Sequence, residues 1–209
     1  MSTILAPMPS APSPQLAGWP RRVPEFAGER WTVEEITAMP NPERFANRRL
    51  FLLHGEIWEQ GMPHAPHDSY LWLASKVIER RLTEEFLVRA QLGMDLADDL
   101  QVIPDILVVK AAFRDFLVNQ PTTADLIVEV SDTTVFFDTT TKAEVYATAG
   151  IPEYWVIDVN ARTLLVLRDP APVGGNGHAY RSSRTLTETD TLTPLAAPNA
   201  TLRVADLLP

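Results

Sequence analysis

A strand, helix and strand pattern in residues 125–158 constrains the fold of this chain more than any other feature. Residues 125–131 read DLIVEVS, a nearly continuous apolar run that is typical of a central strand buried on both faces. A helix is expected over 138–149, because Gly150 can cap it in the left-handed conformation. Residues 153–158, EYWVID, read as a second strand. Such a unit forms a right-handed crossover between parallel strands, which predicts a mixed α/β fold.

The segments around this unit predict further strands and helices. Thr32 and Glu35 have the spacing of a capping box, so a short helix is expected to begin there. Residues 49–60 contain two short apolar runs around His54 and Gly55, which indicates a β-hairpin. In chain order, the remaining predictions are a helix over 67–85, strands over 86–94, 105–109 and 163–168, and a loop over 170–177.

The N-terminal segment differs from the rest of the chain in composition. Residues 1–25 are expected to form a flexible tail, because six of the 18 prolines lie in the first 24 residues. Residues 26–209 are then expected to form one domain. The N-terminus lacks a basic region before an apolar stretch, and the chain has no run of about 18 apolar residues. The sequence therefore predicts a cytoplasmic protein with no membrane partner.

Charge and cysteine content narrow the classes of protein that this chain can be. The 27 acidic residues outnumber the 18 basic ones, and residues 81–160 hold the excess, with 14 acidic and 5 basic side chains. This distribution argues against a protein that grips nucleic acid through a standing basic groove, but it is compatible with an acidic centre that holds cations. The sequence has no cysteine, so any metal must bind carboxylate, histidine or carbonyl groups.

Two carboxylates in apolar strands are the first candidates for chemistry. Glu129 lies in the middle of the run over 125–131, and an ionised carboxylate buried there is costly unless it is paired or binds a cation. The alternative is an edge strand whose polar face points into solvent. Asp105 begins an equally apolar strand after Pro104, although such a pair often serves only to start a strand. Two carboxylates on neighbouring strands would suit Mg²⁺, which also takes water and phosphate ligands.

Lys142 is the third candidate. It is one of only three lysines, against 15 arginines, and it lies near the start of the helix that follows the strand of Glu129. A lysine ammonium is a compact point charge whose pKa responds to its surroundings. The alternative is an exposed residue that pairs with Asp138 one turn earlier, a contact worth only a few tenths of a kcal/mol.

Together these residues resemble the Uma2 family of restriction-endonuclease-like proteins, which belongs to the PD-(D/E)XK nuclease superfamily. The resemblance covers roughly residues 32–209. It rests on Pro104-Asp105, Glu129-Val130, the spaced Asp138, Lys142 and Tyr146, residues 150–158, a hairpin at 54–57, and His67.

The resemblance implies a restriction-endonuclease-like core, with a central mixed β-sheet flanked by helices. In the superfamily pattern, the aspartate after proline and the downstream acid bind the metal, which gives this role to Asp105 and Glu129. The lysine two positions after that acid is replaced here by Ser131, and the family's lysine comes from the next helix. The catalytic residues implied are thus Asp105, Glu129 and Lys142.

The activity implied is Mg²⁺-dependent hydrolysis of phosphodiester bonds in DNA, with Mn²⁺ as a substitute metal. DNA is the expected partner, and its binding should be weak without metal because the chain is acidic. A homodimer is expected by analogy with nucleases that cut both strands. A second hypothesis is a catalytically inactive nuclease fold that acts in DNA binding or protein interaction. RNA or a small nucleotide are alternative substrates.

Three further residues are candidates for accessory roles: Glu56 beside the metal, His67 near the site, and Asp138 as a partner of Lys142. Each has a structural alternative. Glu56 would face solvent on an alternating strand, His67 would cap or pack at the start of its helix, and Asp138 would favour a helix N-terminus through the dipole.

Overall fold

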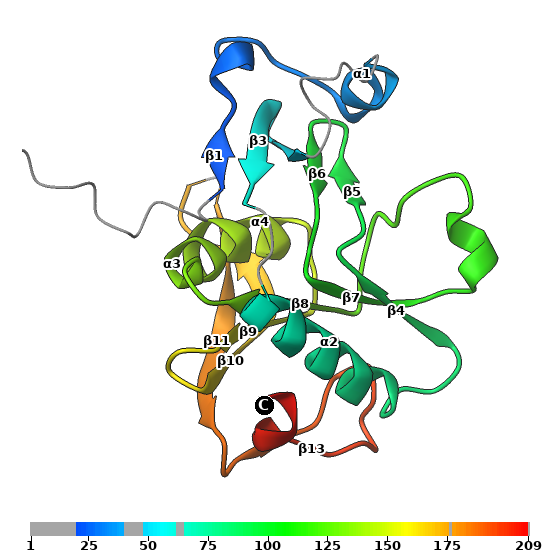
Figure 1. The fold of residues 1–209 in the computed structure, drawn as a ribbon, viewed down its shortest axis with the longest axis vertical. Coiled ribbons are helices and arrows are strands. Elements are labelled where there is room, and N and C mark those ends of the chain that lie inside the picture. Colours follow the sequence, from blue (N-terminus) through cyan, green and yellow to red (C-terminus); the bar gives the residue numbers. More distant parts are fainter. Residues whose placement is uncertain (1–19, 40–47, 62–64, 176, 209) are drawn as a thin grey trace, which may run out of the picture.

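The fold is mixed α/β and contains two main β-sheets (Figure 1). The computed structural model describes residues 20–39, 48–61, 65–175 and 177–208. The larger sheet consists of β4 (Phe86–Ala90), β7 (Ile106–Lys110), β8 (Leu126–Ser131), β9 (Glu153–Asp158), β10 (Thr163–Pro172) and β11 (His178–Thr187), in the order β11-β10-β9-β8-β7-β4. The smaller sheet consists of β1 (Arg21–Arg22), β2 (Arg49–Leu53), β3 (Glu56–Gln60), β5 (Met94–Ala97) and β6 (Leu100–Val102), in the order β1-β3-β2-β6-β5. A third pair joins β12 (Thr191–Leu192) to β13 (Leu202–Arg203).

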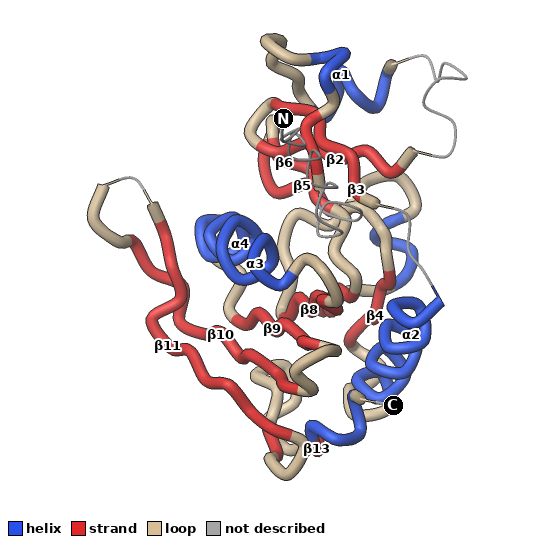
Figure 2. Tube along the Cα trace, turned by 60° about the vertical axis from the view of Figure 1, so that its left-hand side comes forward, coloured by secondary structure: helices blue, strands red, loops and turns tan. Residues whose placement is uncertain are grey.

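Helical segments cover both faces of the larger sheet (Figure 2). On one face, α2 (Ala65–Glu79) packs with the 3-10 helix η6 (Val204–Leu207). On the other face, α3 (Val135–Phe137), the π-helical turn η5 (Asp138–Lys142) and α4 (Ala143–Thr148) follow one another without a break. The remaining helices of the described residues are η2 (Pro24–Phe26), α1 (Val33–Ala38) and η4 (Phe113–Phe116). None of the helices in the described ranges is long and apolar enough to cross a membrane.

Strand β8 lies in the interior of the larger sheet. All six of its residues are buried, and it pairs antiparallel with β7 and parallel with β9. Leu126 and Val130 belong to the core on the α2 side, whereas Ile127 belongs to the core on the α4 side. By the same alternation, Glu129 faces the α4 side. The predicted strand, helix and parallel strand over 125–158 are confirmed, and the alternative of a solvent-facing edge strand is wrong.

Two local signals in the sequence form the predicted structures. The Thr32 hydroxyl accepts a hydrogen bond from the Glu35 N–H, and the Glu35 carboxylate accepts one from the Thr32 N–H, so the capping box of α1 is complete. Between β2 and β3, His54 and Gly55 have φ values of 49° and 75°, as a two-residue type I′ turn requires. The hairpin and the short helix are therefore confirmed.

The structure corrects the predicted helix and strand between residues 67 and 94. Helix α2 ends at Glu79, and Leu82 packs against the core from the segment that follows the helix. The helical spacing of Leu82 in the sequence therefore reflects its packing against the core and not a continuation of the helix. The predicted strand over 86–94 is two strands in different sheets, because Gln91 takes a left-handed φ of 52° after β4 and Met94 starts β5.

The predicted loop over 170–177 is also shorter than expected. Strand β10 continues to Pro172, and its Pro170 pairs with Tyr180 of β11. Strand β9 pairs with β10 only along Thr163–Arg168. The two prolines therefore lie where β10 has no partner on its other side, and their missing N–H groups break no ladder there.

The described residues of the predicted N-terminal tail contact the rest of the fold. Residues 1–19 of the predicted tail lie outside the described residues. The following residues, however, belong to the fold, since Arg21–Arg22 form β1 against β3 and Val23 is buried.

A hairpin that the sequence did not indicate joins β5 to β6. Asp98 and Asp99 form its turn, and both contribute backbone carbonyls to contacts with other segments. The Asp98 carbonyl accepts a hydrogen bond from the Val33 N–H (2.7 Å), and the Asp99 carbonyl accepts one from the Gly55 N–H (2.8 Å). Two acidic residues with no evident role in the sequence thus connect this turn to α1 and to the β2–β3 turn.

Candidate active site

The two carboxylates in apolar strands lie side by side in the larger sheet. Asp105 directly precedes β7, Glu129 lies in β8, and the two strands pair from Ile106 and Val128 onward. The Val130 N–H donates to Asp105 Oδ2 at 2.9 Å, and the Asp105 N–H lies 3.4 Å from Glu129 Oε2. Both side chains are buried, so the sheet itself brings two carboxylates together away from water.

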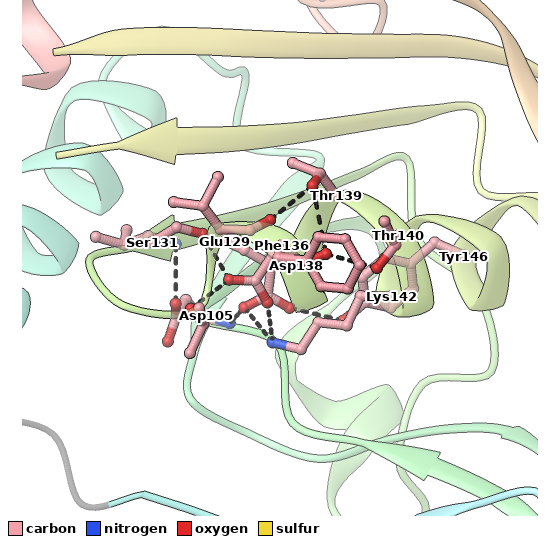
Figure 3. Close-up of polar contacts among 12 residues, drawn as sticks. Asp105, Glu129, Ser131, Phe136, Asp138, Thr139, Thr140, Lys142 and Tyr146 are labelled. Atoms are coloured by element: carbon pink, nitrogen blue, oxygen red, sulfur yellow. Dashed lines mark hydrogen bonds and ion pairs between the residues drawn. The ribbon is translucent and has the colours of Figure 1, made fainter. Parts of the chain in front are cut away.

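Lys142 reaches the same point from the helical side (Figure 3). Its ammonium lies 2.8 Å from Glu129 Oε2 and 3.0 Å from Asp138 Oδ1. The Lys142 side chain is only 12% exposed. The alternative of a surface lysine that pairs with Asp138 alone is therefore wrong, because the same ammonium also binds the buried acid of β8.

Asp138 is the third buried acid of the cluster. Its Oδ2 accepts hydrogen bonds from the hydroxyls of Ser131 and Thr134, each at 2.5 Å, and its backbone carbonyl accepts one from the Tyr154 hydroxyl at 2.9 Å. Asp138 is therefore held within the protein and does not merely favour a helix N-terminus.

The helix that carries Asp138 and Lys142 differs from the predicted α-helix, because η5 is a π-helical turn. Two threonine hydroxyls bond backbone carbonyls of the preceding turn: Thr139 Oγ1 to Val135 O at 2.7 Å, and Thr140 Oγ1 to Phe136 O at 2.5 Å. Side-chain bonds of this kind compete with regular helical bonding, and π-helical turns are frequent at functional sites. The Thr-Thr-Thr run before Lys142 was the signal in the sequence for this irregularity.

Two more side chains complete the contacts of the strand carboxylates. The Nε2 atom of His67, at the start of α2, lies 3.2 Å from Asp105 Oδ2. The buried Tyr146 hydroxyl donates to Glu129 Oε1 at 2.7 Å. In the sequence, Tyr146 belongs to the spaced motif with Asp138 and Lys142, and its place one turn after Lys142 is the signal for this contact. Glu56 lies outside this cluster, because its carboxylate pairs with Arg22 at 2.7 Å.

Burial and the mutual charges shift the pKa values of the cluster. Burial raises the pKa of Glu129 to about 8, with Asp105 and Asp138 adding to this effect and Lys142 opposing it. Burial also acts to raise the pKa of Asp105, but the His67 contact and the Lys142 charge bring it below its ordinary value. Burial acts to lower the pKa of Lys142, yet the three acids raise it well above its ordinary value. Lys142 therefore keeps its proton near neutral pH.

Burial also acts to lower the pKa of His67, but the hydrogen bond and charge of Asp105 outweigh it, so that this pKa is raised. A protonated imidazole beside Asp105 adds positive charge to a cluster in which three acids surround one lysine.

The comparisons with known proteins agree with the family indicated by the sequence. Residues 33–205 match the model of the Uma2 family, which is described as "Putative restriction endonuclease". The chain belongs to the Uma2 family. No curated protein matches it.

Among solved structures, this Uma2 protein is similar to one described as a putative nuclease belonging to DUF820 from Anabaena variabilis ATCC 29413. The TM-score is 0.58 at 19% sequence identity, and the match covers 84% of this chain and 96% of that chain. The predicted fold class, a mixed sheet with helices in a nuclease-like arrangement, is thereby confirmed.

The donor atoms of this Uma2 protein fit a metal held by two carboxylates but not one enclosed by protein ligands. The described residues contain no group of three or more histidine, aspartate or glutamate side chains placed to hold a metal ion. Within the same residues, however, Asp105 Oδ1 is buried without a hydrogen-bond partner, while Oδ2 is bonded twice. Mg²⁺ commonly binds one or two carboxylates and takes its other ligands from water and phosphate. Asp105 and Glu129 match that donor set.

Proposed function

We propose that this Uma2 protein is a divalent-metal-dependent endonuclease that hydrolyses phosphodiester bonds of DNA. One observation carries the proposal: a buried carboxylate oxygen, Asp105 Oδ1, has no hydrogen-bond partner among the described residues, and its neighbour Glu129 contacts the ammonium of Lys142. A buried carboxylate is costly unless it is paired or binds a cation, so the free oxygen of Asp105 is suited to a metal ion. Membership of a family described as "Putative restriction endonuclease" supports the same chemistry.

The metal that fits this donor set is Mg²⁺, with Mn²⁺ as a substitute, and Asp105 and Glu129 would hold it. A bound divalent ion lowers the pKa of a water ligand and offsets charge on the phosphate. The protein fixes the donors beforehand, because His67 and the Val130 N–H hold Asp105 Oδ2 and the Tyr146 hydroxyl holds Glu129 Oε1.

Lys142 would orient the attacking water and stabilise the negative charge that develops on the phosphate. Its pKa is raised by the surrounding acids, so the ammonium donates hydrogen bonds and does not take the proton of the water. Preorganised positive groups of this kind contribute strongly to catalysis in sites that exclude water.

Cleavage of supercoiled plasmid tests the proposal, with Mg²⁺, with Mn²⁺ and with EDTA. Glu129→Gln, Asp105→Asn and Lys142→Met each remove a charge at little change in volume. We expect each to lower the cleavage rate by on the order of 100-fold or more. EDTA should abolish cleavage by the unmodified protein.

The chain offers a matched control in a second lysine–glutamate pair. Lys110 and Glu85 lie 2.7 Å apart at the surface, with side chains that are 62% and 50% exposed. Lys110→Met and Glu85→Gln should leave cleavage within about twofold of the unmodified protein, since exposed pairs contribute little. Cleavage that survives Glu129→Gln and Lys142→Met at the control level would contradict the catalytic roles proposed for these residues. If the unmodified protein cleaves none of the DNA with either metal, the catalytically inactive alternative would hold.

The acidic character of the chain adds an expectation for binding. Because the central residues carry the excess negative charge, DNA should bind weakly in EDTA and more tightly with a divalent ion. Ca²⁺ is used in place of Mg²⁺ so that binding can be measured with little hydrolysis. Gel shifts with duplex DNA, single-stranded DNA and RNA of one length would rank these substrates. Light scattering of the complex would test the homodimer that is expected by analogy with nucleases that cut both strands.

A further inference from the structure

The position two residues after Glu129 carries a hydroxyl where the superfamily pattern has the lysine. Ser131 alternates onto the same face of β8 as Glu129, and it is fully buried. Its hydroxyl donates to Asp138 Oδ2, on the helix that supplies Lys142. Ser131, at the strand position where the superfamily pattern has lysine, is therefore linked to the Lys142 ammonium through the Asp138 carboxylate.

Asp138 divides its two carboxylate oxygens between two tasks. Oδ2 accepts from the hydroxyls of Ser131 and Thr134, both at 2.5 Å, whereas Oδ1 forms the ion pair with Lys142 at 3.0 Å. Two hydroxyl donors on one oxygen fix the plane of the carboxylate and thus the direction in which the other oxygen presents its charge. Neither Asp138 Oδ1 nor Asp105 Oδ1 has a hydrogen-bond partner in the described part of the chain, but Asp138 Oδ1 has the Lys142 ammonium as its ion-pair partner.

A lysine side chain needs such an anchor because its four-carbon stem is flexible. Holding it in one rotamer costs conformational entropy. Glu129 alone could hold the ammonium from one side, but the ion pairs with Glu129 and Asp138 together fix it between the strand and the helix (Figure 3).

We propose that Asp138, held by Ser131 and Thr134, is the positioning residue that places the Lys142 ammonium beside Glu129. This inference rests on the proposed nuclease function, but the placement itself is a property of the protein without DNA. Asp138 acts through Lys142, so its loss should lower kcat and leave KM for DNA nearly unchanged.

The three lysines of the chain make this placement directly measurable by NMR. In protein labelled with ¹⁵N-lysine, a buried and doubly paired ammonium exchanges its protons slowly and gives a visible signal. Lys76 and Lys110 serve as internal controls, because their side chains are 45% and 62% exposed. We expect one slowly exchanging ammonium, from Lys142, in metal-free protein, and its loss in Asp138→Asn.

Thr134 provides the sharpest variants, because its substitution leaves the charge of Asp138 in place. Thr134→Val removes one hydroxyl donor at nearly constant volume, and Thr134→Ser keeps it. We expect Thr134→Val to lower kcat by about tenfold, Asp138→Asn by about 100-fold, and Thr134→Ser to retain the unmodified rate. Mn²⁺ affinity, measured by electron paramagnetic resonance, should change much less than kcat in the Thr134 variants.

Rescue by small amines separates positioning from general structural damage. Ethylamine should restore part of the activity of Lys142→Ala, because Asp138 and Glu129 still form the site for an ammonium. The double variant with Asp138→Asn should not be restored. If Asp138 had only a structural role, ethylamine should restore the same fraction of activity in Lys142→Ala and in the double variant.

The outcomes distinguish this inference from the proposed function. If the unmodified protein cleaves DNA while Asp138→Asn and Thr134→Val keep its kcat and the slow ammonium signal, the positioning role is overturned. If no form of the protein cleaves any substrate, the nuclease function is overturned, and the ammonium signal of the same variants still decides whether Asp138 places Lys142.

Discussion

Glu129 and Glu153 are both fully buried glutamates on adjacent strands of the larger sheet, yet their surroundings differ in kind. Glu153 Oε1 accepts hydrogen bonds from Trp155 Nε1 at 2.9 Å and from the Arg168 guanidinium, and Oε2 accepts one from the Leu195 N–H at 2.7 Å. One acid meets one base, and each carboxylate oxygen has a donor. Glu153 therefore has the contacts of a structural ion pair.

Glu129 belongs to a cluster in which the acidic side chains outnumber the basic ones. It shares the Lys142 ammonium with Asp138, and its neighbour Asp105 keeps one buried oxygen without a hydrogen-bond partner in the described ranges. A buried carboxylate alone is thus a poor indicator of function. An excess of buried negative charge together with a carboxylate oxygen that lacks a donor is a better one, because buried charge is costly unless it is paired or binds a cation.

The largest difference should be seen in stability. Glu153→Gln leaves the Arg168 guanidinium without its carboxylate, which should lower the free energy of unfolding by about 3 kcal/mol. Glu129→Gln should cost much less, because Lys142 keeps Asp138 and the repulsion among the acids is relieved. Urea denaturation of both variants in EDTA measures the difference.

The same two variants should rank in the opposite order for activity. Normalised to folded protein, Glu153→Gln should cleave plasmid at the unmodified rate, whereas Glu129→Gln should not. Equal losses of stability, or a loss of cleavage in Glu153→Gln, would remove the distinction between the structural and the functional glutamate.

Stability as a function of pH sharpens the comparison further. Burial raises the pKa of Glu129 to about 8 in the folded protein, from an ordinary value of 4.5. A group with a raised folded pKa contributes stability that is fully present below its unfolded pKa and is lost as pH rises through its folded pKa. The free energy of unfolding of the metal-free protein should therefore fall by up to a few kcal/mol, relative to that of Glu129→Gln, between about pH 5 and about pH 8.

Glu59 supplies a control of opposite sign for this pH series. The hydrogen bond from Arg48 lowers the pKa of Glu59, so its contribution to stability is present above pH 4.5 and is lost as pH falls. The difference between Glu59→Gln and the unmodified protein should thus be constant over the range in which the Glu129 difference changes. If the difference in stability between Glu129→Gln and the unmodified protein does not change with pH, Lys142 keeps this carboxylate ionised throughout.

The sequence indicated the parts of this site that depend on local pattern. The apolar run around Glu129, the strand after Asp105 and the glycine after the helix located the central strands and Lys142, because burial and capping leave marks in the sequence. The mixed α/β class followed from the order of these elements, and the restriction-endonuclease-like core followed from the family resemblance. The π-helical turn deviated from prediction because threonine side chains, and not the spacing of apolar residues, decide the bonding of that helix.

Contacts between distant segments were not predictable in the same way. Glu153 and Arg168 are 15 residues apart and meet only because β9 and β10 pair in this register. The Asp98-Asp99 turn contacts Val33 and Gly55, far away along the chain. Glu56, by contrast, was a candidate for the site through the family resemblance, and its strand lies in the smaller sheet with arginine partners.

The smallest expected effect concerns the aromatic donor that each glutamate has. Tyr146→Phe removes the hydroxyl that donates to Glu129 Oε1, so the carboxylate loses its orientation beside Lys142. We expect a loss of about 1 kcal/mol of transition-state stabilisation, or roughly fivefold in kcat, as for one hydrogen bond.

Trp155→Phe removes the corresponding donor to Glu153, where Arg168 still binds the same oxygen. It should destabilise the fold by vacating core volume and should leave kcat per folded molecule unchanged. Single-turnover cleavage by folded protein compares the two. If Trp155→Phe slows the chemical step as much as Tyr146→Phe does, both glutamates act on the same reaction, because a purely structural carboxylate can change the amount of folded enzyme but not its rate.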